Sequence, residues 1–158
     1  MNRRTLIALA LAAPAAAAFG QTVHPTGPQP TLPPETLTIT AAGAPHVFHV
    51  EVARTQAQQI TGLMFRTSVA ADGGMLFVWP DPIISRMWMK NTLVPLDMVF
   101  IGADGRIDSI ITDTVPHSLR VLSSHGKVIA TLELAGGTTR RLGITVGDKV
   151  VLPADSRG

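Results

Sequence analysis

A tryptophan flanked by two cations is the feature of this sequence best suited to chemistry. Arg86, Trp88 and Lys90 alternate along a run that reads as a strand, which would place all three on one face. Residues two apart on a strand are about 6.6–6.8 Å apart along it, so a cation on either side can approach the indole. Such a surface can bind a sugar ring or a small anion. Alternatively, Trp88 lies in the core and the two cations extend past its edge to solvent.

Two carboxylates could complete this cluster. We expect Arg66 or Lys90 to pair with Asp97 or Glu133 close to Trp88, at the rim of a small pocket. With Lys90, either acid could serve a small hydrolase or lyase, but no two carboxylates stand at a useful spacing and no nucleophile motif is present. The same residues could instead form a purely structural ion-pair cluster, because a buried cation must be paired.

Soft-metal binding is a weaker alternative. Met87 and Met89 would share one face of the same predicted strand, and thioethers select Cu(I). Methionine also fills irregular gaps in cores, which is the competing interpretation. The chain has no cysteine, and its five histidines form no ligand motif, so we predict no metal site and no cofactor.

The first twenty residues are typical of a signal peptide. Arg3 and Arg4 precede an apolar stretch, and small residues precede Gln21. We expect a periplasmic or secreted protein, exported by the general or the twin-arginine route, with no membrane anchor after cleavage. Loss of the two arginines reduces the 13 basic residues to 11, which balances the 11 acidic ones. The mature chain therefore has no electrostatic reason to bind nucleic acid, and the sequence names no protein partner.

Behind the signal peptide we predict a Pro-rich linker at 21–35, one globular β-rich domain at 36–154 and a short tail at 155–158. Within the domain, short strand-like runs, of which the first two alternate in polarity, are mostly separated by Gly, Pro and Asp turns. The runs are 37–40, 46–52, 75–79, 86–92, 97–101, 106–112, 127–134 and 149–152. One helix at 55–63 begins with a capping box of Thr55 and Gln58, and 138–143 could hold a second helical turn. We predict a mainly β (α+β) fold, a small antiparallel β-barrel or sandwich-like domain with one or two short helices.

Several of these segments carry a resemblance to a known family. They are Gly62-Leu-Met-Phe-Arg66, Gly74-Met-Leu-Phe77, Trp88-Met-Lys-Asn-Thr92, Pro95-Leu-Asp97, Leu132-Glu133 with Ala135-Gly136, and Gly147-Asp148. In this order, over about residues 37–152, they resemble the domain of unknown function 192 family. Met87 departs from the pattern, since the family usually has an aromatic residue before the tryptophan. The resemblance implies a small β-rich domain with short helices, often behind a signal peptide, and no established reaction.

By this resemblance the candidate ligand-binding residues are Arg66, Trp88, Lys90, Asn91, Thr92, Asp97 and Glu133. Asn91 and Thr92 could instead be turn-formers. The favoured function is a non-enzymatic periplasmic module, accessory or binding, whose partner is a small polar ligand such as a saccharide. The hydrolase or lyase and the Cu(I) carrier remain as alternatives.

The signal peptide generates the first testable prediction. Mass spectrometry of a periplasmic fraction should find a mature protein that starts near Gln21. Recovery of the uncleaved chain from the cytoplasm would contradict it.

Overall fold

The computed structural model describes residues 24–156, so the predicted signal peptide lies outside the described residues. The domain is mostly β, with two short helices, as the sequence predicts. In chain order its elements are β1 (Pro34–Ala41), β2 (Ala44–Ala53), α1 (Gln56–Thr61), β3 (Gly73–Ile83), β4 (Arg86–Met87), β5 (Leu96–Gly102), β6 (Ile107–Ile111), β7 (Leu122–Ser123), β8 (Val128–Ala135), α2 (Thr138–Leu142), β9 (Lys149–Val151) and a 3-10 turn (Ala154–Ser156). None of the helices in this part of the chain is long and apolar enough to cross a membrane.

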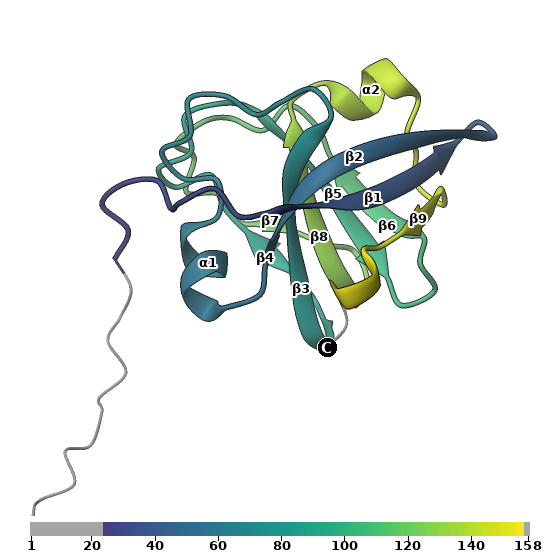
Figure 1. Cartoon of the computed structure of the whole chain (residues 1–158), viewed down its shortest axis with the longest axis horizontal. Coiled ribbons are helices and arrows are strands. Elements are labelled where there is room, and N and C mark those ends of the chain that lie inside the picture. The colour runs from purple at the N-terminus through teal and green to yellow at the C-terminus, as the bar shows by residue number, and fades with distance from the viewer. Residues whose placement is uncertain (1–23, 157–158) are drawn as a thin grey trace, which may run out of the picture.

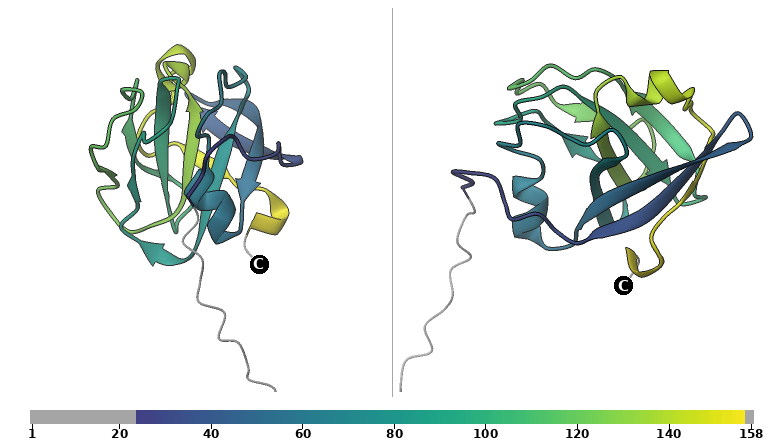
Figure 2. Two further views of the ribbon diagram at one scale, coloured as in Figure 1. Left: turned by 90° about the vertical axis from the view of Figure 1, so that its left-hand side faces the viewer. Right: turned by 45° about the horizontal axis from the view of Figure 1, so that its top comes forward.

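Seven strands form one strongly curled sheet in the order β6-β5-β8-β3-β2-β1-β9. The sheet curls until its two edges meet, where an isolated bridge joins Arg106 to Lys149. The curl is visible in both views of Figure 2. β4 and β7 form a separate two-stranded sheet. All neighbours in the large sheet are antiparallel except β2 and β3, which run parallel and are connected through α1. A parallel pair cannot be joined by a tight turn, so the helical crossover follows from the pairing.

The curled sheet separates two apolar cores. The inner core fills the space that the sheet encloses, and its β8 members are Ala130, Leu132 and Leu134. The outer core lies on the opposite face of β3, β5 and β8, where Met75, Phe77, Met98 and Phe100 are fully buried. Loops and α1 cover this outer face (Figure 1). The central strands are therefore buried on both sides, which is why they read as almost continuous apolar runs.

The short helix α1 forms one wall of the outer core. Its capping box is present: the Thr55 hydroxyl accepts from the Gln58 N–H at 3.2 Å, and the Gln58 side chain accepts from the Thr55 N–H at 2.9 Å. The helix ends at Gly62, whose φ of +50° suits glycine. Both the capping box and the helix are confirmed predictions.

The predicted strand at 86–92 is wrong beyond Met87. β4 ends there, and the next residues form a tight turn in which the Thr92 N–H donates to the Met89 carbonyl at 3.1 Å. Asn91 occupies the left-handed region at φ 55°, which asparagine tolerates better than most residues. Asn91 and Thr92 therefore form a turn, which is the alternative to a ligand-binding role that the sequence leaves open.

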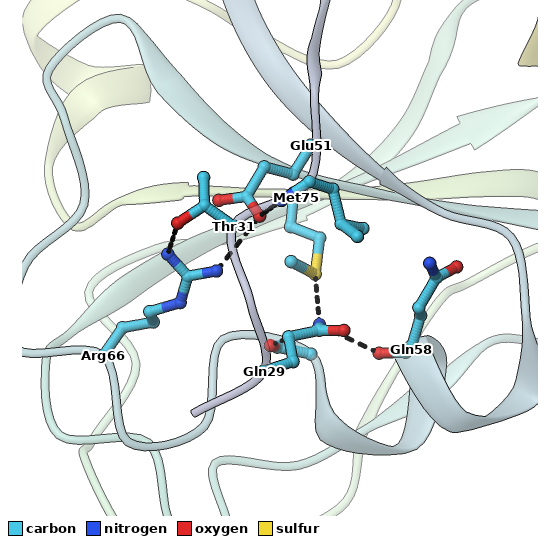
Figure 3. A network of polar contacts seen from close by, with 8 residues as sticks. Gln29, Thr31, Glu51, Gln58, Arg66 and Met75 are labelled. Atoms are coloured by element: carbon cyan, nitrogen blue, oxygen red, sulfur yellow. Dashed lines mark hydrogen bonds and ion pairs between the residues drawn. The ribbon is translucent and has the colours of Figure 1, made fainter. Parts of the chain in front are cut away.

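The segment 24–33, which we call the strap, covers part of the domain although the sequence predicts a linker there. It runs between α1 and the neighbouring loops to reach β1 (Figures 1 and 2). The Gln29 side-chain amide donates to the carbonyl oxygens of Gln58 and Gly62, at 3.2 and 2.9 Å, and lies 3.7 Å from the Met75 sulfur (Figure 3). Side-chain hydrogen bonds thus hold a proline-rich segment that has few backbone donors of its own.

Two central strands approach unusually closely at Gly74. A Cβ placed there would overlap the carbonyl oxygen of Glu133 on β8, a backbone atom that cannot rotate away. The glycine is needed for this approach and not for a special backbone angle.

We expect Gly74→Ala to lower the free energy of unfolding by about 1–3 kcal/mol, because β3 and β8 must separate to admit the methyl group. Gly27→Ala is the matched control, since no atom lies within 4 Å of a Cβ there; it should change stability by less than about 0.5 kcal/mol. Urea melts measure both. Equal stabilities would show that the strands do not approach as described.

Candidate functional site

A cavity of about 290 Å³ opens between the outer face of the sheet and its covering segments. α1 and the residues after it supply one wall, including Ile60, Leu63 and Met64. The lining also includes three aromatic rings and a thioether, from Phe77, Trp79, Trp88 and Met87. A volume of this order, with mostly apolar walls, suits a small organic molecule.

Glu133 is the one acid that lines this cavity. Glu133 pairs with Met75 on the adjacent strand β3 and with Met98 on the adjacent strand β5. Its side chain therefore lies on the outer face of the sheet, between two methionines. The residue is only 5 % exposed. Within residues 24–156 its side chain has no hydrogen bond and no ion pair.

Burial raises the pKa of the Glu133 carboxyl to about 8, because an apolar environment disfavours its charged form. Within residues 24–156 no ion pair offsets this effect. At neutral pH the carboxyl is therefore largely protonated and acts as a hydrogen-bond donor as well as an acceptor. Perturbed acids in a concave pocket are a recognised mark of functional sites.

Polar groups beside Glu133 on the same face are already satisfied. Thr131 lies two residues before Glu133 on β8 and faces the same side of the sheet. Its hydroxyl accepts a hydrogen bond from the Trp79 indole N–H at 3.3 Å and forms a second with the Ser85 hydroxyl at 2.8 Å. Trp79 also stacks on Phe77, with ring centroids 6.2 Å apart. These contacts fix the aromatic wall and leave Glu133 as the unpaired group.

Trp88 stands half-exposed at the cavity, with the Lys90 ammonium 5.2 Å from the centre of its ring. A cation therefore does approach the indole, as predicted, although a turn and not a strand brings it there. Thr92 also lines the cavity, and its hydroxyl lies 3.4 Å from the Lys90 carbonyl oxygen. Lys90 and Asn91 lie beside the cavity without lining it.

Asp97 does not form the predicted pair with Arg66 or Lys90. Its strand neighbours Leu96 and Met98 belong to the outer core, so Asp97 points to the opposite face from Glu133. There its two oxygens accept from the N–H groups of Asp113, Gly137 and Thr139 and from the Thr139 hydroxyl, at 2.7–2.9 Å. Burial opposes ionisation, but these hydrogen bonds outweigh it and hold the pKa of Asp97 below its ordinary value. Asp97 is a structural anchor for α2.

Arg66 also lies elsewhere. Its guanidinium pairs with Glu51 at 3.0 Å and donates to the Thr31 hydroxyl of the strap at 3.3 Å (Figure 3). The same Glu51 carboxylate accepts from the Leu32 N–H at 2.7 Å. Arg66 and Glu51 line a separate cavity of about 250 Å³. The predicted pairing of Arg66 with Asp97 or Glu133 is wrong because a closer carboxylate is available.

The two methionines of the proposed copper clamp are not a strand pair. Met87 ends β4, while Met89 is fully buried and its sulfur lies 3.1 Å from the Thr114 hydroxyl. The described part of the chain holds no group of three or more His, Asp or Glu side chains that could bind a metal ion.

The structure thus brings Trp88, Thr92 and Glu133 together and leaves Arg66 and Asp97 out. Sequence reasoning missed Trp79, Phe77 and the α1 wall. Alternation along 75–79 was the available signal, because it places Met75, Phe77 and Trp79 on one face. A matching signal exists in β8, where Thr131 and Glu133 alternate with Leu132 and Leu134.

Comparison with known proteins agrees with this fold. The model of the DUF192 family, described as "Uncharacterized ACR", matches residues 37–152. A protein of unknown function from Novosphingobium aromaticivorans is 40% identical with a TM-score of 0.75; the match covers 89% of this chain and 99% of that one. A Sinorhizobium meliloti protein, described provisionally as a transcription regulator, is 40% identical with a TM-score of 0.74, over 78% of this chain and 96% of that one. No curated protein matches the sequence.

We expect Asp97→Asn to lower the free energy of unfolding by about 3 kcal/mol or more at pH 7, because an amide nitrogen would then face donors that need an acceptor. Asp113→Asn makes the same charge change at an exposed ion pair with Arg140 and should cost less than about 1 kcal/mol. The lowered pKa means that the ionised form stabilises the fold at higher pH and that this contribution is lost as the pH falls. The difference between wild type and Asp97→Asn should therefore shrink below about pH 4. Urea melts from pH 7 to pH 3 measure this, and a small, pH-independent difference would refute the anchor.

Proposed function

The chain belongs to the DUF192 family, and we propose that it is an exported, non-enzymatic protein that binds a small organic ligand in the Glu133 cavity. The observation that carries the proposal is the unpaired, deeply buried carboxyl at the cavity wall. Burying such a group without a partner costs free energy, so a purely structural role would favour an apolar residue there. A ligand that pairs with the carboxyl would offset this cost.

The shape of the site supports binding more than hydrolysis. Asp97 and Glu133 lie on opposite faces of the sheet, so they cannot act as a pair of acids on one substrate. Lys90 is exposed and its ammonium lies over Trp88. A hydrolase using Glu133 with Lys90 would need the ammonium to enter the cavity, whereas binding needs no such rearrangement.

Export rests on residues 1–20 alone. Their charged start, apolar stretch and small residues before Gln21 support a periplasmic or secreted location. In that compartment a cysteine-free domain keeps its fold without disulfides, by packing and hydrogen bonds.

A fragment screen by ¹H–¹⁵N NMR tests the binding proposal. Molecules small enough for the cavity should shift the resonances of Phe77, Met87 and Glu133 and the indole N–H signals of Trp79 and Trp88. Ile60→Trp, which fills the cavity from α1, should abolish these shifts. Ala57→Trp, on the exposed part of the same helix, should preserve them. A screen in which no fragment perturbs these residues, or in which both variants behave alike, would refute the site.

A further inference from the structure

We propose that the ligand of this cavity is a small organic cation, an ammonium group on a compact apolar body, whose charge pairs with Glu133. This inference rests on the proposed binding function and specifies its ligand class.

The first argument is the number of free polar groups in the cavity. The Gln59 amide already donates to the carbonyl oxygens of Ala53 and Val78, at 3.2 and 3.0 Å. The Thr61 hydroxyl donates to the Ala57 carbonyl at 3.0 Å. Among the buried residues of the lining, Glu133 is therefore the one whose polar side chain has no hydrogen bond. The Gln56 amide and the Gln59 side-chain oxygen are less buried and keep free hydrogen-bonding capacity. A saccharide carries many hydroxyls, and in the buried part of the cavity most of them would find no partner.

The second argument is the character of the walls. Aromatic faces attract cations through their quadrupole, and three aromatic rings line this cavity. Met64 and Met87 add polarizable sulfur to the lining, and Met75 and Met98, the strand partners of Glu133, place no competing charge beside it. An ammonium group would therefore meet one full negative charge surrounded by surfaces that tolerate a cation.

Arg86 is the only other charged residue of the lining, and it must be reconciled with a cationic ligand. It is exposed, so solvent and salt screen its charge. It forms no ion pair with Glu133, whose pKa is perturbed by burial alone. α1 and β3 contribute no charged side chain to the cavity. Arg86 therefore does not neutralise Glu133.

Binding of a cation should release a proton. Glu133 is mostly protonated at pH 7, because its pKa is raised to about 8, and the ion pair requires the carboxylate. The proton passes to the buffer when the ammonium enters. Affinity should accordingly rise with pH, by up to about 10-fold per unit, and level off above pH 8.

Benzylamine and benzyl alcohol make a matched pair of probes, equal in shape and different in charge. Both tryptophans of the chain line the cavity and the chain has no tyrosine, so intrinsic fluorescence reports directly on occupancy. We expect benzylamine to bind at least about 10-fold more tightly than benzyl alcohol at pH 7.5, and Glu133→Gln to remove this preference. Glu35→Gln, which removes a carboxylate paired with Arg54 outside the cavity, should leave the preference unchanged.

Isothermal titration in two buffers of different ionisation enthalpy should detect the released proton in wild type. If Glu133→Gln fails to fold, the wild-type protein still tests the ligand class. Its affinity for benzylamine should rise from pH 6 through 7 to 8.5, whereas its affinity for benzyl alcohol should not change with pH. Equal or tighter binding of benzyl alcohol, or fragments that are all neutral or anionic, would overturn the ligand class and leave the binding function standing. A fragment screen that finds nothing in the cavity would overturn both.

Discussion

Burial of both faces of the central strands is the constraint from which the rest of this domain follows. β3, β5 and β8 separate an inner core from an outer core, so side chains on both faces of these strands become buried. On β8 the residues that face the inner core are Ala130, Leu132 and Leu134. Those that face the outer core include Thr131 and Glu133. Thr131 satisfies its hydroxyl within the protein. Within the described residues Glu133 does not, so its carboxyl group can find a partner only in the cavity that it lines.

Three acids on strands of the large sheet, Asp97, Glu51 and Glu133, fall into two groups with different physical roles. Asp97 and Glu51 accept several hydrogen bonds each and join segments that are distant in sequence: Asp97 fastens α2 to β5, and Glu51 fastens the strap through Leu32 and Arg66. Both acids find their hydrogen-bond donors within the scaffold. Glu133 instead has two methionines as strand partners and shares its cavity with three aromatic rings. Residue type alone does not distinguish an anchoring carboxylate from an unpaired one. The number of hydrogen-bond donors around each carboxylate makes the distinction.

Local patterns predicted the strands and the capped helix because those depend on neighbours in sequence. Strand-like runs between turn signals located seven of the eight predicted strands, and the capping box placed the start of α1 at Thr55. The run at 86–92 failed because Trp88 and its neighbours alternate like a strand, whereas the left-handed backbone at Asn91 ends the pairing. The partners of Arg66 and Asp97 could not be predicted, since they depend on how the strap and α2 return to the sheet. The cavity itself combines α1, β3, β4 and β8, which only the tertiary fold brings together.

The position of β8 has a consequence for how the protein acquires its shape. β8 lies between β5 and β3, so without it the β5–β6 hairpin would meet the β3-β2-β1-β9 unit only where the edges of the sheet join, at Arg106 and Lys149. The pairings of β8 with β5 and with β3 both join residues that are far apart in sequence. Such non-local pairing makes folding slow, because long loops must close first. Glu133 lies on this strand. Its carboxyl group is therefore buried only when β8 pairs with β3 and β5, and the cavity exists only in the assembled sheet.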